Sequence, residues 1–308
     1  AQIAREFDAA MNPAGTLGVF TTAKDRSTEL RDAVRAHAGN GTANGLWAQV
    51  TGGKTKLKGI STGAQDLDLD TDAYGLAVGG EAALQNITLG AAFMGGSGKT
   101  ENDSVAGKDD FNYYGISFYA KTQVQGIDLE GDVSAAWLKS DLTVGGAADV
   151  DTDTTTAVYS LGIQAKKTFN LGVDVTPFIG MDVYHIKSDG FTTNHGVSIE
   201  DANATIVEFP IGAEVKKALQ TSSGFSVAPS FSLAVVPTVG CKDIDSKVRF
   251  AGAESTYNFT FADDVKVRSQ LGIEAQKDNF TLGLAAGYDW GNEERSAASV
   301  QLRAKYAF

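Results

Sequence analysis

Hydrophobic and polar residues alternate with a period of two along most of the chain, from residue 46 to residue 308. The clearest stretch is 280–290, where apolar side chains occupy one face and small or polar ones occupy the other. Its apolar face consists of Phe280, Leu282, Leu284, Ala286, Tyr288 and Trp290. Such alternation is typical of a β-strand with two unlike faces. The pattern therefore predicts an all-β architecture.

Twelve alternating blocks can be counted, and each is long enough for a tilted membrane strand, which needs roughly 9 to 11 residues. The blocks lie near residues 46–56, 72–84, 87–98, 110–123, 127–142, 154–168, 173–188, 204–218, 224–240, 262–277, 279–291 and 296–308. Five short turns alternate with six longer polar loops between them. This arrangement predicts a 12-stranded antiparallel up-and-down barrel with both ends at one rim.

A β-sheet can span a lipid bilayer only as a closed barrel, because every backbone N–H and C=O is then paired around its circumference. We therefore expect a transmembrane barrel with its apolar faces turned to lipid and its small and polar faces lining the lumen. Aromatic residues near the block ends suit the interfacial girdles: Phe111, Tyr113, Tyr114, Trp137, Tyr288, Trp290, Tyr306 and Phe308. The alternative is a soluble β-protein, which would not require so regular an alternation of loop lengths.

The first 45 residues follow a helical pattern instead. Asp25 or Ser27 is a suitable N-cap and Gly39 a suitable C′ residue, so a helix is expected over 27–38. An earlier amphipathic stretch is stopped by Asn12 and Pro13.

The predicted inward face of the barrel is rich in glycine: Gly75, Gly79, Gly90, Gly115, Gly162, Gly212, Gly272, Gly283 and Gly287. Glycine inside strands indicates that another backbone approaches closely. A barrel of this size has room for one helix, about 10 Å across, so we expect the helix inside the lumen. Its basic residues Arg26, Arg31 and Arg35 would then face acidic residues of the wall. These acids are Glu81, Glu130, Asp132, Glu208, Glu214 and Glu274. The alternative is an ordinary periplasmic helix that leads into the first strand.

Composition narrows the possible partners. The chain has 26 basic and 38 acidic residues, a net charge of −12 and a pI near 4.7, so a nucleic-acid partner is not expected. Cys241 is the single cysteine and cannot form an internal disulfide. No cofactor or metal is expected, because the acidic runs 66–72 and 149–153 lack the pattern of a calcium loop. The sequence starts without Met, as a mature or excised fragment does.

Four segments in order resemble the C-terminal translocator of autotransporters, the β-domain of type V secretion. They are the basic helix around residues 25–31, the first-strand run GLWAQV at 45–50, the strand TPFIG at 176–180 and the terminal KYAF. The resemblance covers nearly the whole chain. It implies an outer-membrane protein that exports and anchors its own N-terminal passenger.

The resemblance also implies a division of the chain and a set of partners. Residues 1–24 would be the passenger stump or linker, 25–44 the lumen-plugging helix and its linker, and 45–308 the barrel. Long loops would be extracellular and the C-terminus periplasmic, in a monomer that contacts outer-membrane lipids and lipopolysaccharide. The alternating C-terminal residues Leu302, Tyr306 and Phe308 resemble the signal read by the barrel-assembly machinery.

Three alternatives remain open at this point. The chain could be an outer-membrane porin or a surface adhesin that binds through its loops. A hydrolase would depend on His37, His185 or His195, and no spacing selects partners for them. Some family members cleave themselves at an asparagine in the lumen helix. The expected helix has none, since Asn40 follows it, so we assign no catalytic residue and expect no enzyme activity.

Overall fold

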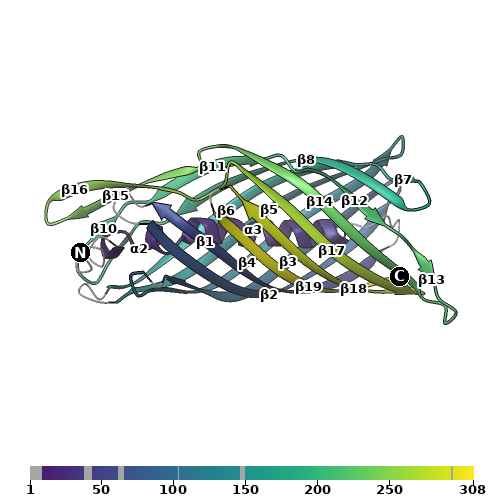
Figure 1. Cartoon of the computed structure of the whole chain (residues 1–308), viewed down its shortest axis with the longest axis horizontal. Coiled ribbons are helices and arrows are strands. Elements are labelled where there is room, and N and C mark those ends of the chain that lie inside the picture. The colour runs from purple at the N-terminus through teal and green to yellow at the C-terminus, as the bar shows by residue number, and fades with distance from the viewer. Residues whose placement is uncertain (1–8, 38–43, 62–65, 103, 146–149, 293) are drawn as a thin grey trace.

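The computed structural model describes residues 9–37, 44–61, 66–102, 104–145, 150–292 and 294–308. Antiparallel strands wrap into a closed 12-stranded cylinder, which confirms the predicted architecture (Figure 1). Each of the twelve strand positions around the cylinder is called a stave below, because two of them consist of more than one strand segment. Ten staves are single strands, one is made of β6 and β7, and one is made of β11, β12 and β13. The barrel strands are β1 (Gly45–Ser61), β2 (Asp66–Leu84), β3 (Ile87–Asn102), β4 (Gly107–Val124), β5 (Ile127–Val144), β6 (Val150–Lys166), β7 (Phe169–Asn170), β8 (Asp174–Ser188), β11 (Ala202–Glu208), β12 (Ile211–Lys216), β13 (Leu219–Gln220), β14 (Ser226–Gly240), β17 (Val265–Lys277), β18 (Phe280–Gly291) and β19 (Arg295–Ala307).

The first and last strands close the cylinder. β1 pairs with β19 from Gly45 opposite Ala307 to Leu57 opposite Arg295. β14 also pairs with β17, although the long loop after Gly240 separates the two strands in the sequence. Because each described stave has a hydrogen-bonded neighbour on both sides, the wall offers no open edge to another sheet.

The loops at 189–203 and 241–261 are more ordered than expected. They contain β9 (Phe191–Thr192), β10 (Ser198–Ile199), β15 (Asp243–Phe250) and β16 (Ala253–Thr260), which pair in a second sheet of four strands. Alternation continues through β15, where Val248 is buried with Ile199 against the half-buried Met11. This small cluster supplies the core that a polar loop would lack.

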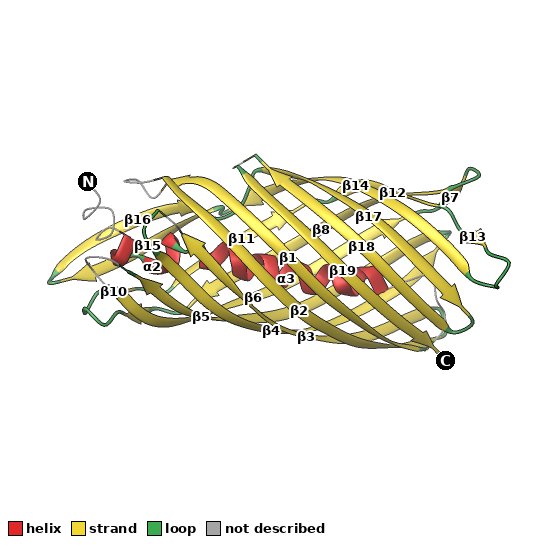
Figure 2. Ribbon diagram, turned by 60° about the horizontal axis from the view of Figure 1, so that its bottom comes forward, coloured by secondary structure: helices red, strands yellow, loops and turns green. Residues whose placement is uncertain are grey.

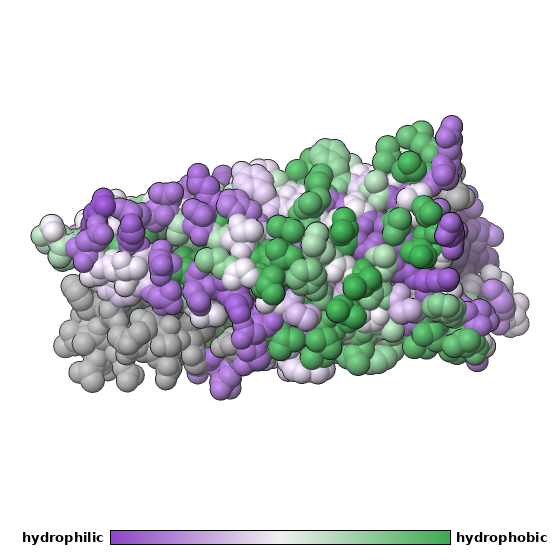
Figure 3. Space-filling view, turned by 90° about the horizontal axis from the view of Figure 1, so that it is seen from above, coloured by the Kyte–Doolittle hydropathy of each residue, from purple (hydrophilic) through white to green (hydrophobic). Residues whose placement is uncertain are grey.

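The outer surface has two zones. Apolar side chains cover the half nearer the C-terminus, and polar side chains cover the half nearer the second sheet (Figure 3). The polar zone carries exposed ion pairs such as Lys54 with Asp70, 3.3 Å between nitrogen and oxygen. β2 and β5, with 19 and 18 residues, exceed the length that a bilayer requires, so these strands continue beyond the lipid.

The two faces of β4 correct part of the expected aromatic girdle. Phe111 and Tyr113 are 1% and 2% exposed and lie inside the barrel. Tyr114 lies on the outer face, where its ring stacks on Trp137 at 5.4 Å between centroids. Nearness to a strand end suggested a girdle for all of them, but the parity of the strand decides the face. Tyr288, Trp290, Tyr306 and Phe308 lie outside, as expected.

Two helices are described, α2 (Pro13–Thr16) and α3 (Val19–His37). Neither is long and apolar enough to span a membrane. α3 runs lengthwise inside the barrel, as expected (Figure 2). It begins at Val19, however, eight residues before the predicted start at Ser27. The expected cap is unnecessary because Phe20 and its neighbours are buried among lumen side chains, and this packing stabilises the first turns.

The inward glycines make room for side chains, which differs from the close backbone contact that we expected. A methyl group at Gly79 would lie 2.3 Å from the Trp47 ring, and one at Gly90 would lie 2.1 Å from the Tyr119 ring. Large aromatic rings thus lie over glycines of the neighbouring strand. They thicken this part of the wall and leave space for the helix.

Candidate functional site: the lumen helix and the channel beside it

The helix leans on one side of the barrel. α3 lies closest to the run of staves from β2 to β8, and most of all to β5, while single long side chains reach the rest of the wall. Leu30 and Val34 are fully buried on that side. A methyl group at Gly115 of β4 would lie 2.9 Å from Leu30, so the absence of a side chain there admits the helix. The helix is therefore off the barrel axis.

A buried cluster of four charges attaches the C-terminal half of the helix to the wall. The Nε atom of Arg31 donates to both carboxylate oxygens of Asp132, at 3.1 and 3.2 Å. Arg35 forms a bidentate pair with Asp182, at 2.5 and 3.0 Å. A methyl group at Gly162 would lie 2.4 Å from Asp132 and 2.7 Å from Arg31, so this glycine leaves space for the cluster.

Charges near the start of the helix are also neutralised by the wall. Lys24 and the wall residue Lys266 share the carboxylate of Glu208, at 2.5 and 2.9 Å, and none of the three is more than 5% exposed. Asp25 accepts from Arg295 at 2.5 Å. Removal of one partner would leave an uncompensated buried charge, which is strongly destabilising.

Each end of the helix has its own attachment. At the start, Phe20 packs against Phe259 with 5.5 Å between ring centroids, and Thr21 donates to the carbonyl of Phe261. At the end, the His37 ring stacks on Trp47 at 4.3 Å, and Lys305 donates to the His37 carbonyl at 3.0 Å. The helix therefore runs from the end that carries the second sheet to the end that carries the C-terminus.

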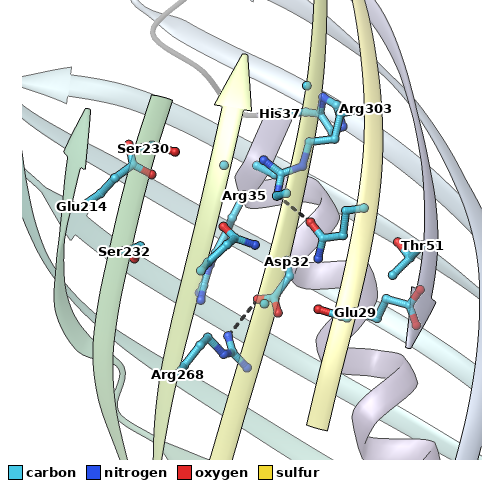
Figure 4. Close-up of a pocket in the computed structure, with 18 of the residues that line it drawn as sticks. Glu29, Asp32, Arg35, His37, Thr51, Glu214, Ser230, Ser232, Arg268 and Arg303 are labelled. Carbon is cyan, nitrogen blue, oxygen red and sulfur yellow. Dashed lines mark hydrogen bonds and ion pairs between the residues drawn. The ribbon is translucent and has the colours of Figure 1, made fainter. Parts of the chain in front are cut away.

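The other side of the lumen is hollow. A cavity of about 810 Å³ lies between the helix and the wall formed by β12, β14, β17, β18, β19 and β1. This wall carries small side chains: Ser230, Ser232, Ala234, Gly272, Gly283, Ala285, Gly287, Ala297, Ala298 and Ser299. Asp32 of the helix points across it to Arg268, at 3.2 Å (Figure 4). A channel lined by small and charged residues thus runs beside the helix.

The predicted wall acids all lie on inward positions, but they serve different partners. Asp132 contacts Arg31 and lies 3.8 Å from Arg35. Glu208 binds Lys24, while Glu81, Glu130 and Glu274 pair with the wall residues Lys305, Lys166 and Lys216. Glu214 lines the channel. Arg26, the third predicted helix cation, pairs with Glu29 of the helix itself at 2.5 Å.

The sequence did not indicate two residues that form ion pairs between the helix and the wall. Asp182 receives both helix arginines, and its signal was an acid at an inward position in the middle of β8. Lys24 lies before the predicted helix start, so its contact with Glu208 was not anticipated.

The C-terminal residues lie on the outer face beside the closing strand. Leu302, Tyr306 and Phe308 are 56%, 51% and 63% exposed. The backbone N–H of Phe308 donates to the carbonyl of Asn44, at 2.9 Å. The predicted assembly signal is therefore an exposed apolar row at the pairing of β1 with β19.

Comparison with protein families gives a match to the autotransporter β-domain over residues 46–289. The chain belongs to the autotransporter β-domain family. It is thus a translocator domain of type V secretion, a transport unit of the outer membrane that exports a passenger. Curated protein sequences give no match.

Solved structures of autotransporter barrels share the fold of this β-domain. The translocator domain of NalP from Neisseria meningitidis has a TM-score of 0.74 and 14% identity, covering 94% of this chain and 97% of that one. The transport unit of AIDA-I from Escherichia coli has a TM-score of 0.67 and 14% identity, covering 96% and 99%. The β-domain of the Bordetella autotransporter BrkA has a TM-score of 0.60 and 16% identity, covering 86% and 100%.

Proposed function

We propose that the β-domain exposes its long loops outside the cell and its short turns to the periplasm, with the chain upstream of α3 emerging on the outside. The direction of the helix supports this proposal. Thr21 is bound to the long-loop segment at Phe261, whereas His37 is bound to Lys305 near the C-terminus. A passenger attached before the helix would therefore leave the barrel at the long-loop end.

In this proposal α3 is the last segment of the passenger and partly plugs the lumen. Gly18 has φ +63° and Val19 starts the helix, so we place the junction between linker and plug at Gly18 and not at residue 24. The barrel acts as a monomer, in keeping with its closed sheet. Leu302, Tyr306 and Phe308 are offered to the barrel-assembly machinery. The polar outer zone, including Lys54, meets lipopolysaccharide.

We further propose that the domain anchors its passenger without cleaving it. The helix sequence from Val19 to His37 contains no asparagine, and its charged side chains are engaged in ion pairs with the wall or with each other. The domain is then a transport unit and not an enzyme.

The native cysteine provides a direct test of orientation. Cys241 is exposed and lies between β14 and β15, on the long-loop side. We expect a membrane-impermeant maleimide to label it on intact bacteria that express the chain behind a signal sequence. The matched control places the cysteine on the short-turn side, in the double variant Cys241→Ser with Ser223→Cys. This control should be labelled only after the outer membrane is opened. The reverse pattern would overturn the orientation.

A further inference from the structure

Two hairpins at the short-turn rim share a pattern that the translocation function does not use. The turn between β6 and β8 contains the run KKTFN at 166–170, and the turn between β12 and β14 contains KKALQ at 216–220. A proline lies opposite each run, Pro177 or Pro229, and its carbonyl accepts from the second lysine's N–H at 3.2 Å. Because proline has no N–H, each ladder loses a bond here and the hairpin can bend away from the barrel. Figures 1 and 2 show both hairpins projecting past the rest of the rim.

The first lysine of each pair is used inside the barrel. Lys166 lies 3.5 Å from Glu130 of β5, and Lys216 contacts Glu274 of β17. Both first lysines have carboxylate partners on the inner face, on the adjacent strand β5 for Lys166 and one strand further, beyond β14, for Lys216, so they belong to the wall of the lumen.

The second lysine of each pair faces outward. Lys167 and Lys217 are exposed, and the described residues supply no ion-pair partner to either one. The ammonium group of Lys167 lies 5.5 Å from the ring centroid of Phe169. Lys277 lies 5.0 Å from the ring centroid of Phe225 in the second hairpin. Each hairpin thus carries an exposed aromatic ring with a cation beside it, Lys167 of the same hairpin in the first and Lys277 of the adjacent strand β17 in the second.

Apolar side chains at or beside the tips of both hairpins continue the lipid-facing belt. In the first hairpin Ile163 and Ile179 belong to the belt, and Leu171 at the tip is 75% exposed. In the second hairpin Leu219 and Phe225 are 47% and 39% exposed. A lysine with apolar side chains above and below it suits the boundary of a bilayer, where the stem lies in lipid and the ammonium group reaches the headgroups.

We propose that these two hairpins form a binding surface for anionic phospholipid headgroups, in the leaflet at the short-turn rim. Lys167, Lys217 and Lys277 would contact lipid phosphates while Leu171, Leu219 and Phe225 enter the acyl region. Continuity with the apolar belt favours lipid over a soluble protein, because a protein-binding surface would be separated from the belt by polar residues. The leaflet assignment rests on the orientation proposed above, but the lipid contact does not.

The two hairpins lie far from the strands that close the barrel. β6, β8, β12 and β14 lie across the cylinder from the pairing of β1 with β19. Lipid would therefore hold the wall opposite the closing strands and leave those strands free of this attachment.

The experiment compares brominated anionic and zwitterionic lipid as quenchers of a fluorophore on each hairpin. Leu171→Cys and Leu219→Cys, each in a Cys241→Ser background, carry the fluorophore in refolded full-length chain. The matched control is Leu84→Cys, an exposed apolar position at the two-residue turn after β2, because the single lysine of β2 and β3, Lys99, lies at the opposite end of β3 and pairs with Glu101. Vesicles of phosphatidylcholine contain a minor fraction of brominated phosphatidylglycerol or brominated phosphatidylcholine.

We expect brominated phosphatidylglycerol to quench the hairpin labels more strongly, with a preference up to about fivefold per lysine, and to show no preference at Leu84. Lys167→Gln combined with Lys217→Gln and Lys277→Gln should reduce the preference towards the control value. All three lysines are exposed, so the barrel should fold, which heat-dependent gel migration checks.

Three results would overturn the proposal. Labels that neither lipid quenches would place the hairpins in water and leave the tips for a soluble partner. Equal quenching by both lipids would show that the hairpins do not prefer anionic headgroups. A preference for phosphatidylglycerol that persists in the lysine variant would show that these lysines do not cause it. Both leaflets of the vesicle have the same composition, so these results are independent of the Cys241 labelling that tests the orientation.

Discussion

Arg31 of the lumen helix and Asp132 of β5 lie 101 positions apart in the chain, and they meet with neither side chain more than 1% exposed. Arg35 reaches the same carboxylate at 3.8 Å, and Asp182 of β8 completes the cluster. Two charges from the helix are thus neutralised by two from the wall. The helix can occupy this part of the lumen only when these pairs form, since unpaired charges would be costly in a buried site.

Reversal of the helix charges should release the plug. In Arg31→Glu with Arg35→Glu, four carboxylates would face one another, and helix docking should weaken by about 3–5 kcal/mol or more. We expect faster proteolysis of the helix and a larger single-channel conductance in planar bilayers. The control is Lys54→Glu with Lys56→Glu, which reverses two exposed cations that pair with Asp70 on the outer wall. If the charge-reversed helix variant and the control show the same conductance and the same proteolysis, the four-charge cluster does not attach the helix to the wall.

The space at Gly162 should matter as much as the charges. In Gly162→Ala the new methyl group would lie within 2.9 Å of Asp132, Arg31 and Arg35, so the cluster must move apart. Overpacking of this kind typically costs about 1–3 kcal/mol, and we expect a conductance between those of the native chain and the charge-reversed variant.

Gly52→Ala is the matched control for this change, because a methyl group there has no neighbour within 4 Å. Native conductance in Gly52→Ala with raised conductance in Gly162→Ala would support the role of the glycine. If Gly162→Ala also shows native conductance, the cluster tolerates the methyl group and the argument fails.

The aromatic contact at the start of the helix should close the long-loop end. Phe259 is 3% exposed and packs on Phe20, so Phe259→Ala should cost about 3–5 kcal/mol through the cavity that it leaves. We expect protease cleavage near Val19 from the long-loop side, with the rest of the barrel resistant. Phe231→Ala, on the lipid-facing side, is the control and should leave this cleavage unchanged. A protected site at Val19 in both variants would contradict the prediction.

The sequence could predict the barrel because its strands obey one local rule. Alternation gave the number of strands and the face of each residue, and the same rule would have put Phe111 and Tyr113 inside had parity been weighed above their position near a strand end. The start of the helix was misplaced because local capping favoured Ser27, whereas burial of Phe20 by distant residues sets the start.

The partners within the lumen could not be predicted in the same way. Asp132 and Asp182 meet the same arginines because β5, β6 and β8 are neighbours at a particular stagger. The stagger of a barrel is a global property that local alternation does not contain. The asymmetry of the lumen has the same origin, since it depends on which staves carry the aromatic rings that lie over glycines.

The hollow side of the lumen offers a prediction that separates the channel from the helix. Gly287 of β18 lines the cavity, and the nearest side chain to a methyl group there is Ser299, at 2.8 Å. Gly287→Phe should fill part of the cavity and lower the single-channel conductance, while the ion pairs of Arg31 and Arg35 on the opposite wall stay intact. Ala286→Phe is the matched control, because the preceding residue faces the lipid and tolerates an aromatic ring. We expect native conductance in Ala286→Phe, reduced conductance in Gly287→Phe, and the same protease resistance of the helix in both. Equal conductance in the two variants would show that current does not pass along this wall.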